Sequence, residues 1–201
     1  VVDTEGVVSA NLQRGLGGFF LATPQAEQDA DEATSEGLFV HTGELRPQIK
    51  VGLRVRVRGS VVEVGARDGG AGFTAIGQLS QLTVCGEGQR PVPVQVAAPP
   101  PDWERYEGMR VALPGPLTLV ANHELLRHGR IEVSLAGRLF EPTERFPPGP
   151  DARELAAANA RARLLVDDNL EAENPRRIWW LGPPVSAARP WRTGTLLSGL
   201  T

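Results

Sequence analysis

The feature of this chain that most limits its fold is the strict alternation of side chains in VGLRVRVRGSVVEVG, residues 51–65. Hydrophobic side chains take every second position and arginine side chains the positions between them: Val51, Leu53, Val55 and Val57 against Arg54, Arg56 and Arg58. A period of two is typical of a β-strand with one face in the core and the other in water. Gly59 interrupts the pattern, where a bulge or bend would let the strand turn a barrel corner.

Four further segments have the composition of short strands bounded by glycine or turn residues. They are residues 5–12, 17–23, 37–43 and 73–86. The 23 glycines and 17 prolines are spread along the chain, which indicates many short elements joined by turns. Five short strands with glycine at their corners predict an all-β fold that begins with a small closed barrel, and the OB-fold is the commonest barrel of five strands.

A proline-rich stretch, residues 91–101, is expected to be stiff and extended. We therefore place a domain boundary near residue 99. The prediction is an OB-fold-like barrel in residues 1–98 and a second, smaller β-rich domain in residues 99–201.

The second domain has weaker patterns than the first. Residues 109–143 have the composition of strands and a hairpin, and a short helix is predicted near residues 150–162 because a proline and an aspartate precede an alanine-rich run. Residues 161–168 and 176–181 are interpreted as further strands. Residues 192–201 resemble the opening of another strand, which leaves open whether this domain is complete or truncated.

Charge and composition exclude several classes of protein. The net charge of −3 argues against a generally basic nucleic-acid binder, but residues 43–67 carry six basic residues against Glu44 and Glu63, a local net charge of +4. The single cysteine, Cys85, excludes an internal disulfide and a cysteine zinc site, and we expect it to be buried.

No apolar run approaches the roughly 20 residues of a membrane span. Because the only methionine is Met109, the chain is expected to be a processed or excerpted piece.

An acidic stretch, QDADEATSEGLFVHTG at residues 28–43, has two interpretations. Asp29 and Asp31 match the first interval of an EF-hand calcium loop, but the residues that follow, Glu32, Ala33 and Thr34, break its ligand spacing. The interpretation that we favour is a solvated loop in which residues 35–37 turn the chain into a strand.

The row of Arg54, Arg56 and Arg58 is the sharpest candidate for a binding site. Outward residues of a strand lie about 6.5–7 Å apart along one face, which is close to the spacing of phosphates along an extended single strand. Arginine can bind each phosphate through two parallel hydrogen bonds. The alternative is that outward arginines only keep a strand edge soluble.

Aromatic side chains on the second and third strands are the candidate stacking surface. OB-folds combine a basic groove with aromatic faces on which bases stack, and these two strands form the usual platform. The candidate residues are Phe39, His41 and one of Phe19 and Phe20, of which we select Phe20. The alternative is that the phenylalanines belong to the core.

Three groups in the second domain have both a structural and a chemical interpretation. His123, Glu124 and His128 are expected at a hairpin end, because the histidines are five positions apart and not at the i, i+4 spacing of a zinc-binding helix. Asp167, Asp168 and Asn169 suit a turn after a strand, with calcium binding as the alternative. Trp179, Trp180 and Trp191 beside Arg176, Arg177 and Arg192 predict a stacking or cation–π surface, a core, or an interface.

Seven blocks of the sequence resemble, in order, the region upstream of the catalytic domain in large bacterial extracellular endonucleases of the ExeM/NucH type. The blocks are GVVSANL, GGFFLAT, DADEATSEGLFVHTG, VGLRVRVRGSVVEV, ERYEGMRVALPGPLTLV, GRIEVSLAGRLFEPTE and LAAANARARLLVDDN. They cover nearly the whole chain, and ATSEGLFV at residues 33–40 and ERYEGMRV at residues 104–111 are the most specific. Two stretches depart from the family pattern, GFFLAT in place of GFFIQD at Ala22 and Thr23, and NPRRIWWLGPP near the end.

The resemblance implies an extracellular, OB-like and non-catalytic module that binds nucleic acid. It also implies that hydrolysis takes place in a later endonuclease/exonuclease/phosphatase domain, which uses divalent metal and is absent from this chain, so that this segment needs no cofactor. Expected partners are DNA or RNA and the nuclease domain that follows. The alternative function is a structural spacer that packs against the nuclease domain without binding nucleic acid. An independent hydrolase would require a triad, a metal cluster or a paired-acid cleft, none of which the sequence indicates.

Overall fold

The computed structural model describes residues 1–31, 33–64, 72–170, 172–176, 178, 180 and 191–199. The chain forms two compact units. The first comprises residues 1–94 and 103–111, and the second comprises residues 95–102 and 112–201. The segment 103–111 therefore returns to the first unit, although it lies beyond the boundary expected near residue 99.

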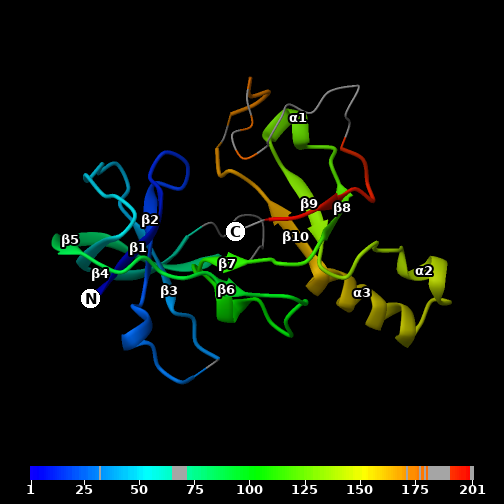
Figure 1. Cartoon of the computed structure of the whole chain (residues 1–201), viewed down its shortest axis with the longest axis horizontal. Coiled ribbons are helices and arrows are strands. Elements are labelled where there is room, and N and C mark those ends of the chain that lie inside the picture. The colour runs from blue at the N-terminus through cyan, green and yellow to red at the C-terminus, as the bar shows by residue number, and fades with distance from the viewer. Residues whose placement is uncertain are drawn as a thin grey trace. The chain divides into compact units, whose positions relative to one another are not determined.

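The first unit is a closed β-barrel of five strands (Figure 1). Its strands are β1 (Val2–Leu12), β2 (Gly18–Ala22), β3 (Gly37–His41), β4 (Leu53–Val64) and β5 (Phe73–Glu87). They close in the order β1-β2-β3-β5-β4, with β3 and β5 parallel and every other neighbouring pair antiparallel. The predicted all-β, OB-like fold is confirmed.

The alternation on β4 places its side chains on the predicted faces, but Val51, which precedes β4 and was predicted on the apolar face, is 38% exposed. Val55 and Val57 are fully buried, whereas Arg56 and Arg58 are exposed. The barrel core contains residues from all five strands and the loop before β4: Val8, Phe19, Leu21, Val40, Ile49, Val55, Val57 and Ile76. Burial of these apolar side chains supplies the main driving force for the barrel.

Gly59 lies at a bulge, as expected from its position in the alternating pattern. The register between β4 and β5 shifts between Arg58 and Ser60. A Cβ atom at Gly59 would lie 2.5 Å from the carbonyl oxygen of Gly77, so the two backbones are too close for a side chain.

The second unit contains a four-stranded antiparallel sheet in the order β10-β9-β8-β11. Its strands are β8 (Leu117–Ala121), β9 (Ile131–Ser134), β10 (Arg163–Val166) and β11 (Leu196–Leu197), and its helices are α1 (Leu125–His128), α2 (Pro142–Arg145) and α3 (Pro150–Ala162). The helix predicted near residues 150–162 thus corresponds to α3. Of the segment 176–181, the described residues Arg176, Ile178 and Trp180 lie outside any strand, contrary to the predicted strand there.

Short elements complete the described chain. They are β6 (Val94–Gln95), which pairs with β7 (Val111–Ala112), and the 3-10 turns η1 (Gln25–Glu27) and η2 (Glu104–Tyr106). None of the helices in the described ranges combines the length and apolar character needed to cross a membrane.

Candidate nucleic-acid interface

The arginine row on β4 is paired with acidic side chains. The guanidinium of Arg54 donates hydrogen bonds to Glu5 on β1 and, at 2.9 Å from Nη1 to Oε1, to Glu27 in η1. Arg56 Nη2 lies 2.8 Å from the second carboxylate oxygen of Glu5. Arg58 lies opposite Asp3 in the β1–β4 register.

Electrostatics of this row favour a structural role. The hydrogen bond from Arg54 is the largest cause of a lowered pKa of the Glu5 carboxyl; partial desolvation opposes it, and the hydrogen bond from Arg56 lowers the pKa further. The bonds to Glu5 and Glu27 in turn raise the pKa of Arg54. Since Glu5 and Glu27 pair with Arg54 and Arg56, and Asp3 lies across from Arg58 in the register, much of the positive charge of the row is compensated.

The predicted stacking residues lie together, but they do not form an open platform. Phe19 points into the core, whereas Phe20, Phe39 and Phe73 form a layer of rings on the outer side of the barrel. The ring centroid of Phe39 lies 4.8 Å from that of Phe20 and 5.1 Å from that of Phe73. Phe39 is only 1% exposed, so it presents no ring face to solvent, contrary to the stacking role expected for it. The neighbouring rings enclose it.

Phe20 and His41 remain partly exposed at the two sides of Phe39. The His41 ring lies 6.4 Å from that of Phe39. His41 also lies next to the loop between β1 and β2, because a Cβ atom at Gly17 would lie 3.4 Å from its Nε2. This loop is one of the ligand-binding loops of OB-folds.

A second set of basic side chains comes from the β1–β2 loop, the β3–β4 loop and the chain after β5. We define the barrel-end cluster as Arg14, Arg46, Lys50 and Arg90. Two hydrogen bonds join the segments that carry the first three, Gln13 Nε2 to the Pro47 carbonyl at 3.1 Å and Asn11 Nδ2 to the Ile49 carbonyl at 2.8 Å. The side chain of Arg90 lies over Gly52, at 3.4 Å from the position of a Cβ atom there.

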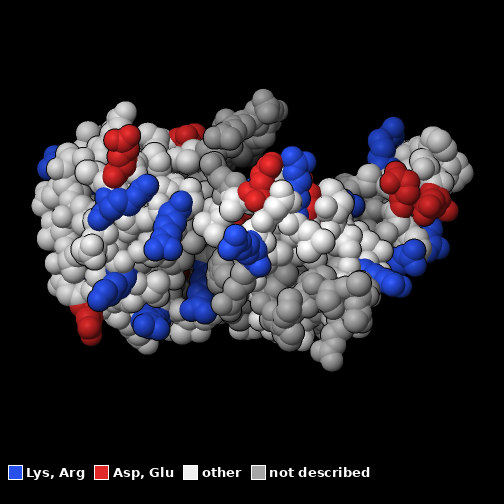
Figure 2. Space-filling model, turned by 90° about the horizontal axis from the view of Figure 1, so that it is seen from above, with Lys and Arg blue, Asp and Glu red and all other residues white. Residues whose placement is uncertain are grey.

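The barrel-end cluster differs from the β4 row in its pairing. Within the part of the chain that the structure describes, none of its four side chains forms an ion pair with a carboxylate. Arg46 donates only to the carbonyl of Gly43 in its own loop, at 3.0 Å. Figure 2 shows Lys and Arg side chains gathered over the barrel half of the face that it views, with few acidic side chains between them.

A groove of about 190 Å3 adjoins the cluster at Arg90. It lies between the start of the β2–β3 loop and the extended chain after β5, and glutamine side chains line it: Gln25, Gln28 and Gln89. Because small-molecule sites usually measure about 300–1,000 Å3, this groove is better suited to part of an extended ligand.

The acidic loop forms a self-contained turn. Asp29 Oδ1 accepts a hydrogen bond from the amide of Asp31 at 2.8 Å, and Asp31 Oδ1 accepts one from the amide of Ala33 at 2.9 Å. Such side-chain turns satisfy the backbone without a metal ion. Across the described residues, no three His, Cys, Asp or Glu side chains converge where a metal ion would fit.

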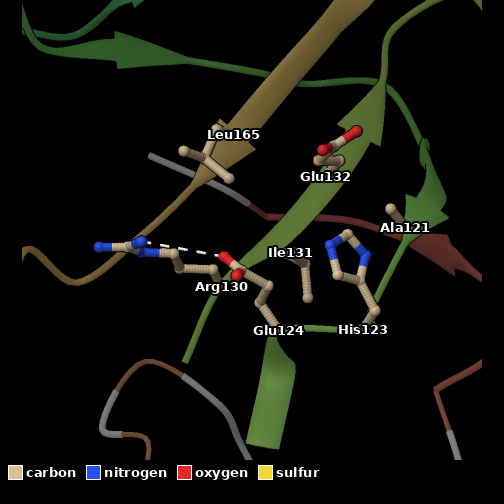
Figure 3. A pocket seen from close by; sticks show the side chains of 7 residues that line it. All are labelled: Ala121, His123, Glu124, Arg130, Ile131, Glu132 and Leu165. Carbon is tan, nitrogen blue, oxygen red and sulfur yellow. Dashed lines mark ion pairs between the residues drawn. The ribbon is translucent and has the colours of Figure 1, made fainter. Parts of the chain in front are cut away.

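Two groups in the second unit form turns and ion pairs. His123 and Glu124 line a small hollow of about 30 Å3 with Arg130 and Glu132, and Figure 3 shows Arg130 directed toward Glu124. Arg130 also pairs with Asp167, at 2.6 Å from Nε to Oδ2. A hollow of this size holds about one water molecule.

The carboxylates after β10 close a turn, as predicted. Asp167 Oδ1 accepts from the amide of Asn169 at 3.1 Å, and Asp168 Oδ1 accepts from the amide of Leu170 at 3.0 Å. Asn169 has a φ of 56°, the left-handed conformation that asparagine tolerates in turns.

The tryptophan group is only partly described, because Arg177 and Trp179 lie outside the described residues. Trp180 is partly buried, donates from Nε1 to the Gly129 carbonyl at 3.1 Å and lies 6.2 Å from Trp191 between ring centroids. Arg176 is exposed. These contacts make Trp180 part of the packing around α1.

Cys85 departs from expectation, because it is exposed on β5 and not buried. Its side chain points outward from the end of the strand, beyond the part of β5 that packs in the core.

No protein-family model, no curated protein sequence and no solved structure matches this chain. The resemblance to extracellular endonucleases therefore remains a prediction from the sequence blocks.

The barrel-end cluster was missed by sequence reasoning, because its members come from three separate segments. The net positive charge of residues 43–67 was the available signal for Arg46 and Lys50. Arg14 and Arg90 are single residues in neutral or acidic surroundings, and no local pattern groups them with Arg46 and Lys50.

Proposed function

We propose that this chain is a non-catalytic module that binds nucleic acid and positions it for the nuclease domain of an extracellular bacterial endonuclease. The observation that carries the proposal is the barrel-end cluster of Arg14, Arg46, Lys50 and Arg90, which has no carboxylate partner among the described residues. Arg14 lies in the β1–β2 loop, where OB-folds contact oligonucleotides, and Gln13 of the same loop bonds to the Pro47 carbonyl next to Arg46. The nuclease context and the extracellular location rest on the sequence resemblance.

Binding of this kind is electrostatic and sensitive to salt. Each phosphate neutralised on a single strand contributes a slope of about −0.7 to the dependence of log affinity on log salt concentration. Four contacts therefore give a slope of about −3. His41 and Phe20, at the two sides of Phe39, add contacts with the bases.

The test is a fluorescence-anisotropy titration with labelled single-stranded DNA, duplex DNA and RNA at several salt concentrations. Three variants are compared with the parent chain. The first replaces the barrel-end cluster with alanine; the second replaces the β4 row of Arg54, Arg56 and Arg58; the third is a charge-matched control that replaces four exposed arginines of the second unit, Arg127, Arg138, Arg145 and Arg153.

We expect the barrel-end variant to lose most of the affinity and of the salt slope, and the control to keep both. The same affinity in the barrel-end variant and the control would contradict the proposal. A β4-row variant that stays folded and loses binding just as strongly would instead move the site to the row predicted from the sequence.

The alternative is a structural spacer, which the charge compensation of the β4 row favours. A spacer would bind no nucleic acid even at low salt. Its deletion from the full-length protein would still disrupt the folding or the activity of the nuclease domain.

A further inference from the structure

The outer face of β2 and β3, the ligand platform of OB-folds, is crossed at one end by a later part of the chain. We define this segment, residues 103–110, as the strap. A Cβ atom at Gly37 would lie 2.3 Å from the carbonyl carbon of Gly108, so the two backbones are in direct contact. A Cβ atom at Gly108 would in turn lie 3.3 Å from the ring of Phe20. The strap thus lies against the first residue of β3 and beside the ring layer.

Two hydrogen bonds to Glu107 tie the strap to the barrel, and the Arg110 carbonyl accepts a third from the amide of Val94 at 2.9 Å. The Ser35 hydroxyl donates to the Glu107 carbonyl, and the amide of Thr74 donates to Glu107 Oε1 at 2.9 Å. The bond to Thr74 is exposed to solvent and the bond from Ser35 is partly buried. A bond that exchanges readily with water contributes little net stability, so the exposed bond from Thr74 is one that a ligand can replace.

The strap divides the platform into two parts. At the covered end, Ala22 pairs with Gly37, and the strap lies over that pair. At the other end Gly18 pairs with His41, beside the β1–β2 loop that carries Arg14. The ring layer lies between the two ends, with Phe20 nearest to the strap.

We propose that the strap competes with nucleic acid for the outer face of β2 and β3 and is displaced as a strand extends from the barrel-end cluster across the ring layer. This inference rests on the proposed function and adds its regulation. The strap limits the bound length in the free protein, and its displacement exposes Phe20 and Phe73 for base stacking. When a site is open in only a fraction of the molecules, its apparent affinity is the affinity of the open site multiplied by that fraction.

The variant Ser35→Ala/Glu107→Ala removes both bonds to Glu107, together with the bond from the Gly37 amide to Ser35 Oγ, and leaves the barrel-end cluster unchanged. Loss of two such bonds shifts the opening equilibrium by about tenfold. The matched control is Glu63→Ala/Ser80→Ala, which also removes one carboxylate and one hydroxyl from the barrel surface without a contact to the strap. The control corrects for the effect of the lost negative charge on DNA affinity.

Affinity for labelled single-stranded DNA is measured for the parent and both variants, together with hydrogen exchange of residues 103–110 in the parent with and without DNA. We expect the strap variant to bind several-fold to tenfold more tightly than the control, and the strap to exchange faster when DNA is bound. If the parent binds DNA but the strap variant and the control bind equally, the strap inference is wrong and the proposed function stands. If neither the parent nor the strap variant binds at low salt, both are wrong.

Discussion

Replacement of Phe39 separates a packing role from a stacking role. Phe39 is 1% exposed and has two aromatic neighbours, Phe20 at 4.8 Å and Phe73 at 5.1 Å between ring centroids. Each such pair contributes about 0.5–1.5 kcal/mol beyond the burial of apolar area. Phe39→Leu, which nearly keeps the volume, should therefore lower the free energy of unfolding by about 1–3 kcal/mol. Phe39→Ala adds the cost of a cavity and should lower it by about 3–5 kcal/mol.

Urea denaturation followed by circular dichroism measures this loss. With a slope of about 2 kcal/mol per molar urea, a loss of 2 kcal/mol moves the midpoint of the barrel transition by about 1 M. The control is Phe146→Leu, because Phe146 is 40% exposed, and it should change stability by less than about 0.5 kcal/mol. A Phe39→Leu protein that is as stable as this control, yet binds DNA much more weakly, would refute the packing argument and restore Phe39 as a stacking residue.

Two further predictions concern β1 and the barrel corner. Because the pKa of Glu5 is lowered in the folded state, its contribution to stability is present above the unfolded pKa of about 4.3 and is lost as the pH falls through the lower folded value. Glu5→Gln should therefore be less stable than the parent at pH 7 and approach it below about pH 4 in thermal unfolding; a constant difference at all pH values would contradict this. Gly59→Ala places a Cβ atom 2.5 Å from the Gly77 carbonyl oxygen, and should cost about 1–3 kcal/mol. Gly115→Ala, which meets no atom within 4 Å, is its control, and equal melting temperatures would refute the steric argument.

The glycine pair at the strap joins two of the sequence blocks on which the resemblance depends. Gly37 belongs to ATSEGLFV and Gly108 to ERYEGMRV, and the two backbones meet directly. Gly108 has a φ of 67°, which also favours glycine. The blocks can be recognised from the sequence, but the contact between them cannot. It joins residues more than 70 positions apart along the chain, as does the bond from Ser35 to Glu107, with a separation of 72.

The candidate site was predictable only in part. The arginine row of β4 was placed on the correct face of its strand, and Phe20, Phe39 and His41 were placed on the same outer side. Their surroundings were not predictable, because Glu5 and Glu27, which pair with Arg54, come from β1 and η1. Whether a charged row is available to a ligand depends on which strand lies beside it, and local patterns carry no information about that neighbour.

The sequence by itself determined the elements of the barrel, because alternation with a period of two and glycine at the corners act within a few residues. It also determined α3, where a proline and an alanine-rich run suffice to begin and continue a helix. The tertiary structure alone decided that β3 lies parallel to β5, that Arg54 and Arg56 pair with carboxylates of β1 and η1, and that the strap covers part of the outer face. Each of these features is a contact between segments that are far apart in the sequence. Such segments become neighbours only when the barrel closes, so local sequence patterns cannot reveal the contact.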